Sequence, residues 1–229
     1  MPRNAYSWFG AADLAAHGQD ALWEAMNDQP YSPSGPVGFT LGRRTRNHIN
    51  GAFVLREQFE QIVTDPLGVE HSIQGHRVQT ARFRLSQRCK LLELTGSARA
   101  GRHLLSWFAT QSSQEVVVTP LAPPMAWWVQ ELPSSFSGTR VVAAELRHIR
   151  VEGGVEAAIR LTGESGVLRE ARRHSSDLSD CARLSFRIRT NGAWKDIEIT
   201  SRGRILVEAD DSSILRKLRT IVATFMKSV

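Results

Sequence analysis

Cysteine is scarce in this chain, which has only Cys89 and Cys181. Two thiols are too few for a structural zinc site, which needs four ligands. No His-Glu-x-x-His sequence supplies a second set of metal ligands. The sequence therefore predicts no metal and no other cofactor.

Long apolar runs are also missing, which argues against a segment that crosses a membrane. The first residues lack the charged start and apolar stretch of a secretory signal. A disulfide between the two cysteines is not expected in the cytosol. Together these features predict a cytoplasmic protein without a membrane partner.

Motifs for catalysis are absent too: there is no phosphate-binding loop, dinucleotide fingerprint or nucleophile elbow. Asp196 and Glu198 lie on one face of a predicted strand and could serve a metal-dependent nuclease as ligands. Lys195 falls on the opposite face, however, and Arg187 is placed to pair with these carboxylates. We therefore expect no catalytic residues. An enzyme stays open as a third alternative, and a non-catalytic protein is favoured.

Lysine is rare, accounting for four of the 29 basic residues, while the formal net charge is +6. Residues 1–110 and 111–229 each carry an excess of +3, so neither end forms a basic tail. Arginine suits bidentate contacts with phosphate, although a GC-rich coding bias would give the same composition. An excess of this size is compatible with nucleic-acid binding and does not demand it.

The clearest local pattern lies near the C-terminus, where residues 182–190 alternate between apolar and polar side chains. Such alternation predicts a strand with one buried face, formed by Leu184, Phe186 and Ile188. Asn191-Gly192 follows and favours a two-residue hairpin turn, because both residues tolerate positive φ.

That turn fixes a register in which Phe186 faces Ile197 and Leu184 faces Ile199. On the other face, Arg187 is opposite Asp196, and Arg189 is opposite Trp194. Opposite charges across two strands are an ordinary source of sheet stability, so these arginines need no ligand to explain them.

A three-residue turn, Ser201-Arg202-Gly203, then pairs Ile199 with Ile205 and Ile197 with Val207. Asp211 or Ser212 caps a final amphipathic helix. The apolar stripe of this helix is Ile214, Leu215, Leu218, Ile221, Val222 and Phe225.

Elsewhere the patterns predict an α+β fold. Residues 1–135 form a mixed N-terminal part, and residues 136–229 form an antiparallel β-meander closed by the final helix; one continuous domain is the alternative. Expected helices cover residues 11–26, 57–63, 98–110 and 125–132. Expected strands before residue 136 cover 37–41, 49–55, 76–85, 90–94 and 116–118. The meander adds 141–151, 155–161 after a turn at Gly153-Gly154, and 167–173.

Basic side chains cluster in four places: a predicted loop over residues 42–48, one strand, a segment before a polar loop, and the final helix. The candidate nucleic-acid-binding residues are Arg43, Arg44, Arg46, Arg82, Arg84, Arg172, Arg173, Arg216, Lys217 and Arg219. If they converge, we expect a non-catalytic nucleic-acid-binding protein, or a subunit of a nucleoprotein assembly, with DNA or RNA left open. Isolated, solvated arginines are the alternative.

A protein-interaction or scaffold subunit is the alternative function, with a protein partner or a second copy of the chain. It would use a sheet edge, the final helix or the Trp127-Trp128 pair. The two adjacent tryptophans cannot both face inward, so one of them is expected at a surface, as rim packing or as a contact.

Overall fold

The computed structural model describes residues 3–11, 19–111, 118–150, 155–208 and 211–228. The chain forms two compact units. Unit 1 combines Met1–Gly10 with Thr119–Val229, and unit 2 is Ala11–Val118. The division expected between residues 135 and 136 falls inside unit 1, between a helix and a strand.

The predicted α+β class is wrong, because the protein is mostly antiparallel sheet. Of the described residues, 49% are in strands and 28% in helices. The main cause is residues 57–63, expected as a helix, which continue a long strand. A strand at the N-terminus, which the patterns did not predict, adds to the sheet.

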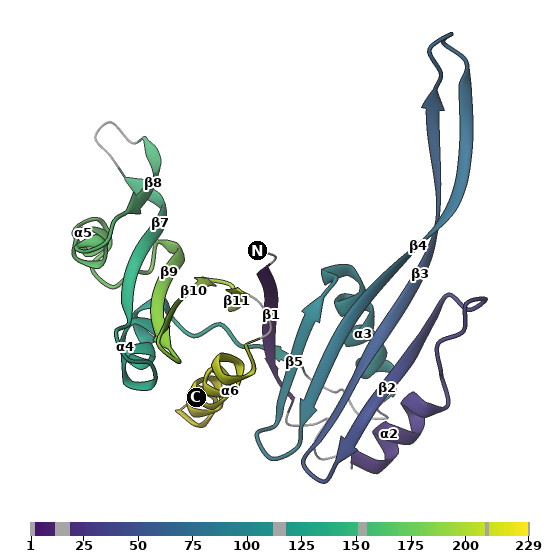
Figure 1. Cartoon of the computed structure of the whole chain (residues 1–229), viewed down its shortest axis with the longest axis horizontal. Coiled ribbons are helices and arrows are strands. Elements are labelled where there is room, and N and C mark those ends of the chain that lie inside the picture. The colour runs from purple at the N-terminus through teal and green to yellow at the C-terminus, as the bar shows by residue number, and fades with distance from the viewer. Residues whose placement is uncertain (1–2, 12–18, 112–117, 151–154, 209–210, 229) are drawn as a thin grey trace. The chain divides into compact units, whose positions relative to one another are not determined.

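Unit 2 contains four antiparallel strands that pair in the order β2-β3-β4-β5, with two helices packed against them (Figure 1). Its elements are α2 (Gln19–Asn27), β2 (Val37–Thr45), β3 (His48–Thr64), β4 (Glu70–Ser86), β5 (Leu91–Gly96) and α3 (Ala98–Gln111). Helix α2 confirms the later part of the helix expected at 11–26; residues 12–18 lie outside the described residues, as do 116 and 117 of an expected strand.

Aromatic rings fill the core of unit 2. Phe39 packs edge-on against Phe53 and Phe83 from neighbouring strands. Helix α3 adds Trp107 over Phe39 and Phe108 over Phe83. The cluster fixes α3 on this face of the sheet, since edge-on ring pairs add to the gain from burial.

In unit 1 the strands pair antiparallel in the order β8-β7-β9-β10-β11-β1, and β6 also pairs with β1. Its elements are β1 (Arg3–Gly10), β6 (Thr119–Pro120), α4 (Met125–Ser135), β7 (Arg140–Arg150), β8 (Glu156–Thr162), α5 (Val167–His174), β9 (Cys181–Thr190), β10 (Ala193–Thr200), β11 (Arg204–Glu208) and α6 (Ser212–Ser228). The turn expected at Gly153-Gly154 lies outside the described residues.

The predicted register of the C-terminal strands is confirmed. Phe186 lies opposite Ile197, and Leu184 lies opposite Ile199. Asn191 and Gly192 both have positive φ, of 49° and 80°, as the two-residue turn requires. The three-residue turn pairs Ile199 with Ile205.

Asp211 caps α6, and it is one of the two residues expected to do so. Its Oδ1 accepts hydrogen bonds from the backbone N–H groups of Ser213 and Ile214, at 3.0 and 3.3 Å. The predicted apolar stripe is buried, except that Phe225 is half-buried against Trp127.

The meander prediction is wrong in two ways. Residues 167–173, expected as a strand, form α5, and β7 lies between β8 and β9 instead of following sequence order. Val167 and Ala171 are the buried residues of α5, four apart as on one helical face. Glu170 near its start and Arg172, Arg173 and His174 near its end also suit the helix dipole.

The basic loop expected at residues 42–48 is mostly strand. Thr45 pairs with His48, so only Arg46 and Asn47 form the turn, and Arg43 and Arg44 belong to β2.

No helix among the described residues is long and apolar enough to span a membrane.

Candidate functional site

Strands β3 and β4 continue past their neighbours as a two-stranded ribbon (Figure 1). Leu55 is the last buried residue of β3, and Ala81 is the first buried residue of β4. Between them, residues 58–78 are exposed apart from the half-buried Asp65 and Gly75. We call residues 58–78 the arm.

The arm is a continuous hairpin. Its pairing runs without a shift from Gln58 opposite His76 to Thr64 opposite Glu70. Asp65-Pro66-Leu67-Gly68 closes it, with the Gly68 N–H donating to the Asp65 carbonyl at 3.0 Å. Asp, Pro and Gly occupy the positions of a four-residue turn that each of them favours.

The Asp65 carboxylate organises the tip of the arm. Its Oδ1 accepts hydrogen bonds from the backbone N–H groups of Leu67, at 2.8 Å, and Val69, at 2.9 Å. His71 Nε2 lies 3.2 Å from the other oxygen. The bond from the Val69 N–H, followed by the His71 contact, lowers the pKa of Asp65 below its usual value.

Apolar side chains crowd onto this exposed ribbon. Of the ten large hydrophobic residues found exposed in the described part of the chain, seven belong to the arm. Leu67 at the tip is 88% exposed and Ile62 is 63% exposed. The seven are Phe59, Ile62, Val63, Leu67, Val69, Ile73 and Val78. Exposed apolar side chains concentrated on one element are typical of interaction sites in soluble proteins.

Both faces of the arm share these side chains. The register puts Phe59, Val63 and Ile73 on one face, and Ile62 and Val78 on the other, because directly paired residues point the same way. An arm with two apolar faces suits insertion into a partner better than lying flat on a surface.

Neither edge of the arm is paired within the described residues. Strand β2 pairs with β3 only as far as Leu55, and β5 pairs with β4 only from Ala81. An isolated two-stranded hairpin is at best marginally stable in water, and its open edges can accept another strand.

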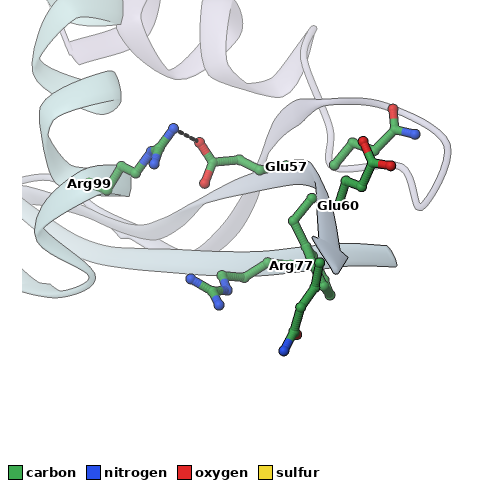
Figure 2. Close-up of a pocket in the computed structure, with 7 residues that line it drawn as sticks. Glu57, Glu60, Arg77 and Arg99 are labelled. Atoms are coloured by element: carbon green, nitrogen blue, oxygen red, sulfur yellow. Dashed lines mark ion pairs between the residues drawn. The ribbon is translucent and has the colours of Figure 1, made fainter. Parts of the chain in front are cut away.

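The base of the arm is anchored to unit 2 (Figure 2). Arg99 of α3 pairs with Glu57 at 2.6 Å, and Gln79 donates to the same carboxylate at 2.8 Å. A pocket of about 390 Å³ lies here, lined also by Phe59, Glu60 and Arg77. These contacts fix the point from which the arm extends.

The arm differs in charge from the rest of the chain. It contains Glu60, Asp65 and Glu70 against Arg77, a net charge of −2, while the whole chain is +6. The remainder therefore carries +8. A negative arm repels phosphate, so the arm itself does not suit a nucleic-acid backbone.

Five predicted nucleic-acid-binding residues lie in unit 2. Arg44 forms an ion pair with Asp20 and lies 5.7 Å from the centre of the Trp23 ring. Arg84 lies directly across from the buried Glu93. The other three, Arg43, Arg46 and Arg82, are exposed and form no ion pair within the described residues.

The other five lie in unit 1. Arg173 pairs with Glu170 at 2.8 Å. Lys217 donates to the Ser135 carbonyl at 2.9 Å and lies 4.9 Å from the centre of the Phe136 ring. Arg172 and Arg216 are exposed, and Arg219 is half-buried. The predicted residues are thus shared between the two units.

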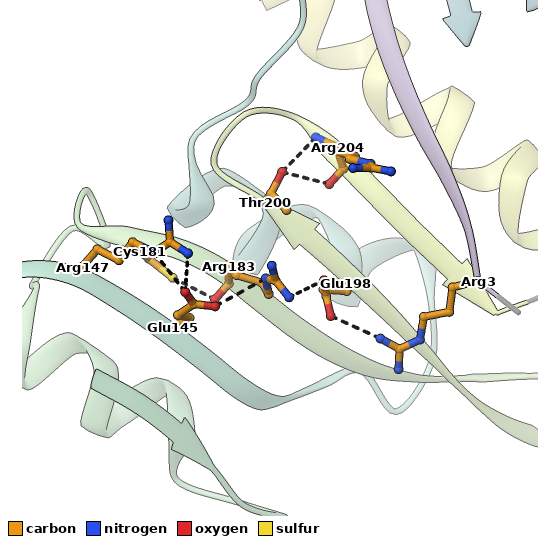
Figure 3. Close-up of polar contacts among 8 residues, drawn as sticks. All are labelled: Arg3, Glu145, Arg147, Cys181, Arg183, Glu198, Thr200 and Arg204. Atoms are coloured by element: carbon orange, nitrogen blue, oxygen red, sulfur yellow. Dashed lines mark hydrogen bonds and ion pairs between the residues drawn. The ribbon is translucent and has the colours of Figure 1, made fainter. Parts of the chain in front are cut away.

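A chain of ion pairs covers the polar face of the unit 1 sheet (Figure 3). Glu198 binds Arg3 at 3.2 Å and Arg183 at 3.1 Å, and Arg183 also reaches Glu145. Arg147 donates to Glu145 at 2.6 Å, and this bond lowers the pKa of the Glu145 carboxyl.

These pairs weigh against the nuclease alternative. Asp196 lies 3.0 Å from Arg187, as its register predicts, and Glu198 is held between two arginines. Among the described residues, no three His, Cys, Asp or Glu side chains gather as metal ligands. Cys181 is buried, and this burial raises the pKa of its thiol, which suits a core residue better than a nucleophile.

The tryptophan pair behaves as rim packing. Trp128 is 1% exposed, and Trp127 packs edge-on between Trp128 and Phe225, at ring distances of 5.0 and 5.1 Å. Trp127 therefore contributes to the contact of α4 with α6, which supports the structural alternative for it.

A groove of about 660 Å³ lies beside α5 in unit 1. Val141 and Leu168 give it an apolar part, and Arg140, Arg169 and Arg172 give it positive charge. Glu164 also lines the groove and pairs with Arg140 at 2.8 Å and with Arg187 at 3.0 Å. Of the predicted site residues, only Arg172 lines it.

The arm was missed because residues 57–63 were expected to be helical. A signal for it was nonetheless present: Asp65-Pro66-Leu67-Gly68 follows a run with Phe59, Ile62, Val63 and Thr64, and Val69, Ile73 and Val78 come after it. No protein-family model matches the chain, and no curated protein matches its sequence.

Proposed function

We propose that the protein is an assembly subunit that binds another protein through the arm. The observation that carries this proposal is the concentration of exposed apolar side chains on a ribbon with two unpaired edges. This corresponds to the scaffold alternative, with the arm in place of the final helix and the tryptophans.

Burial of the arm would supply the binding energy. Moving a Leu, Ile or Phe side chain from water into a packed interface contributes about 1.5–3 kcal/mol. Phe59, Ile62, Leu67 and Ile73 are available for this. A partner strand along either open edge would also satisfy backbone hydrogen-bonding groups, as in β-strand addition.

Site-specific photocrosslinking in the native cells tests the proposal. A photoreactive residue is placed at Leu67 or Ile73, both exposed on the arm, and at Val155 as a control, which is 59% exposed in unit 1. We expect a defined protein adduct from the arm positions, identified by mass spectrometry, and none from position 155. The absence of a protein adduct at both arm positions, or adducts with nucleic acid alone, would overturn the proposal.

Nucleic-acid binding through the arginines is the second candidate. It is favoured by the exposed Arg43, Arg46 and Arg82, which lack ion pairs within the described residues, and by the charge of +8 outside the arm. Fluorescence anisotropy with short DNA and RNA duplexes and single strands tests it.

If these three arginines contact phosphates of duplex DNA, affinity should fall about 40-fold between 50 and 200 mM salt, through counterion release. The triple Arg43→Ala/Arg46→Ala/Arg82→Ala variant should bind weakly and show a flatter salt dependence. A lack of binding at low salt would exclude this candidate. The unpaired thiols of Cys89 and Cys181 support the expected cytoplasmic location for either function.

A further inference from the structure

We infer that the partner of the arm is a second copy of this chain, and that the arm tip of one copy docks in the α5 groove of the next. This inference rests on the proposed function of the arm. It is supported by the opposite charges of the arm and the groove, and by the apolar surface that each of them exposes.

The groove keeps an uncompensated positive charge. Arg140 is neutralised by Glu164, and its guanidinium lies 4.9 Å from the centre of the Trp194 ring. Glu164 also forms an ion pair with Arg187. Arg169 and Arg172 are exposed and form no ion pair in the described part of the chain. They lie three apart on α5, hence on one side of the helix.

The arm tip has the complementary chemistry. Leu67 is the most exposed of the large hydrophobic residues found in the described chain, at 88%. Asp65 and Glu70 flank it, within an arm whose net charge is −2. Leu67 would meet Val141 and Leu168, while the acidic residues would meet Arg169 and Arg172.

The volumes also agree. A groove of about 660 Å³ is within the range of roughly 300–1,000 Å³ typical of sites that enclose a drug-sized ligand. It is therefore large enough for the few side chains of a hairpin tip. An arm-to-arm contact would instead bring together two ribbons of net charge −2, which is less favourable.

Contact between an arm and a groove is heterologous, because the two surfaces differ. Each copy would offer one arm and one groove, so association would continue into a ring or an open chain of copies. This arrangement makes a specific prediction for mixtures of variants, which an arm-to-arm dimer does not make.

Sedimentation velocity at low salt over a range of concentrations tests the inference. The wild type should associate as its concentration rises. Leu67→Asp removes the apolar tip, and Arg169→Glu/Arg172→Glu reverses the charge of the groove. All three residues are exposed, so the fold should survive. Each variant alone should associate roughly tenfold more weakly or worse, the effect of losing about 1.4 kcal/mol.

Mixing the two variants should restore one contact, between the intact arm of the groove variant and the intact groove of the arm variant. The expected product is a 1:1 complex that grows no further. Val155→Asp and Arg202→Glu/Arg216→Glu are matched controls at exposed positions outside both surfaces, and they should associate like the wild type.

Three results would overturn the inference: a wild type that remains monomeric at every concentration, association unaffected by the groove variant, or a mixture without a 1:1 complex. If the arm crosslinks to a different protein, the proposed function stands and self-assembly fails. If the arm crosslinks to no protein, both fail.

Discussion

Two glycines in unit 1 share a backbone conformation but not an environment. Gly192 and Gly203 have φ values of 80° and 74°. A Cβ at Gly192 would meet no atom within 4 Å, whereas one at Gly203 would collide with the Leu121 carbonyl oxygen. The sequence predicted both turns. It could not predict that residue 121 approaches Gly203, because these two residues are far apart in the sequence.

Alanine at each position separates backbone strain from collision. Gly192→Ala should cost about 1–2 kcal/mol, the penalty for a left-handed non-glycine residue. Gly203→Ala should cost distinctly more, because the main chain near Leu121 must also move. Urea unfolding measures both changes. Equal losses of stability would contradict the collision.

The cap of α6 gives a second prediction for a single residue. Asp211→Ala should lower the free energy of unfolding by about 1 kcal/mol, whereas Asp211→Asn should retain most of it. The hydrogen bond from the Ser213 hydroxyl, followed by those from the Ile214 and Ser213 N–H groups, lowers the pKa of Asp211 below 3.8.

A carboxyl whose pKa is depressed by folding stabilises the protein above its unfolded pKa. That contribution is lost as pH falls through the depressed value. The stability advantage of the wild type over Asp211→Asn should therefore be full at neutral pH and disappear well below pH 3.8. Chemical unfolding at both pH values measures it, and an advantage that persists in acid would contradict this account.

Single residues also show how far the sequence could lead. The pairing of Arg187 with Asp196 follows from the Asn191-Gly192 turn and is confirmed. Arg189 does lie opposite Trp194. The guanidinium over that ring, however, comes from Arg140. Placing Arg140 requires knowing that β7 adjoins β9, which no local pattern indicates.

At the scale of elements, the sequence was most informative where turn and pattern agreed. Strands β9 to β11 and helix α6 follow from alternation and two turns. Helix α5 was mistaken for a strand, because a short segment with few apolar residues shows the helical spacing of apolar positions only weakly. Strand β1 was missed, although Tyr6 and Trp8 are buried at a spacing of two residues.

The first strand of the arm, at residues 57–63, was mistaken for a helix because its charged and polar residues interrupt any strict alternation. Its tip supplies a test of the hairpin itself. Asp65→Ala removes the acceptor for the Leu67 and Val69 N–H groups, so these amides should exchange faster with solvent. Asp65→Asn keeps an acceptor, so the same two amides should exchange more slowly in this variant than in Asp65→Ala. Identical exchange in the two variants would mean that the side chain does not hold the turn.

At the scale of the whole molecule, the arrangement of segments was the hardest feature to predict from the sequence. Unit 1 joins the first ten residues to the last half of the chain, and β1 pairs with β11. Such pairings link residues about two hundred positions apart, from Ser7 with Arg204 to Arg3 with Glu208, and periodicity carries no information about them. For the same reason, the sequence could not predict that the ten candidate basic residues are divided between the two units.

Charge at this scale leads to a further prediction. If an acidic arm binds a basic groove on another copy, salt should weaken association, because exposed charges are screened within about 10 Å at 0.1 M ionic strength. The apolar part of the contact should remain. Sedimentation equilibrium at several salt concentrations measures this dependence, and association that strengthens with salt would indicate a purely apolar contact.

The central claim is that the arm is an incomplete structural element that a protein partner completes. Hydrogen exchange of the amides in residues 58–78, with those of β9 and β10 as an internal reference, tests it most directly. We predict fast exchange of the arm in dilute, isolated protein and slow exchange in the assembled state, with the reference unchanged. Equal protection of the arm in both states would contradict the account.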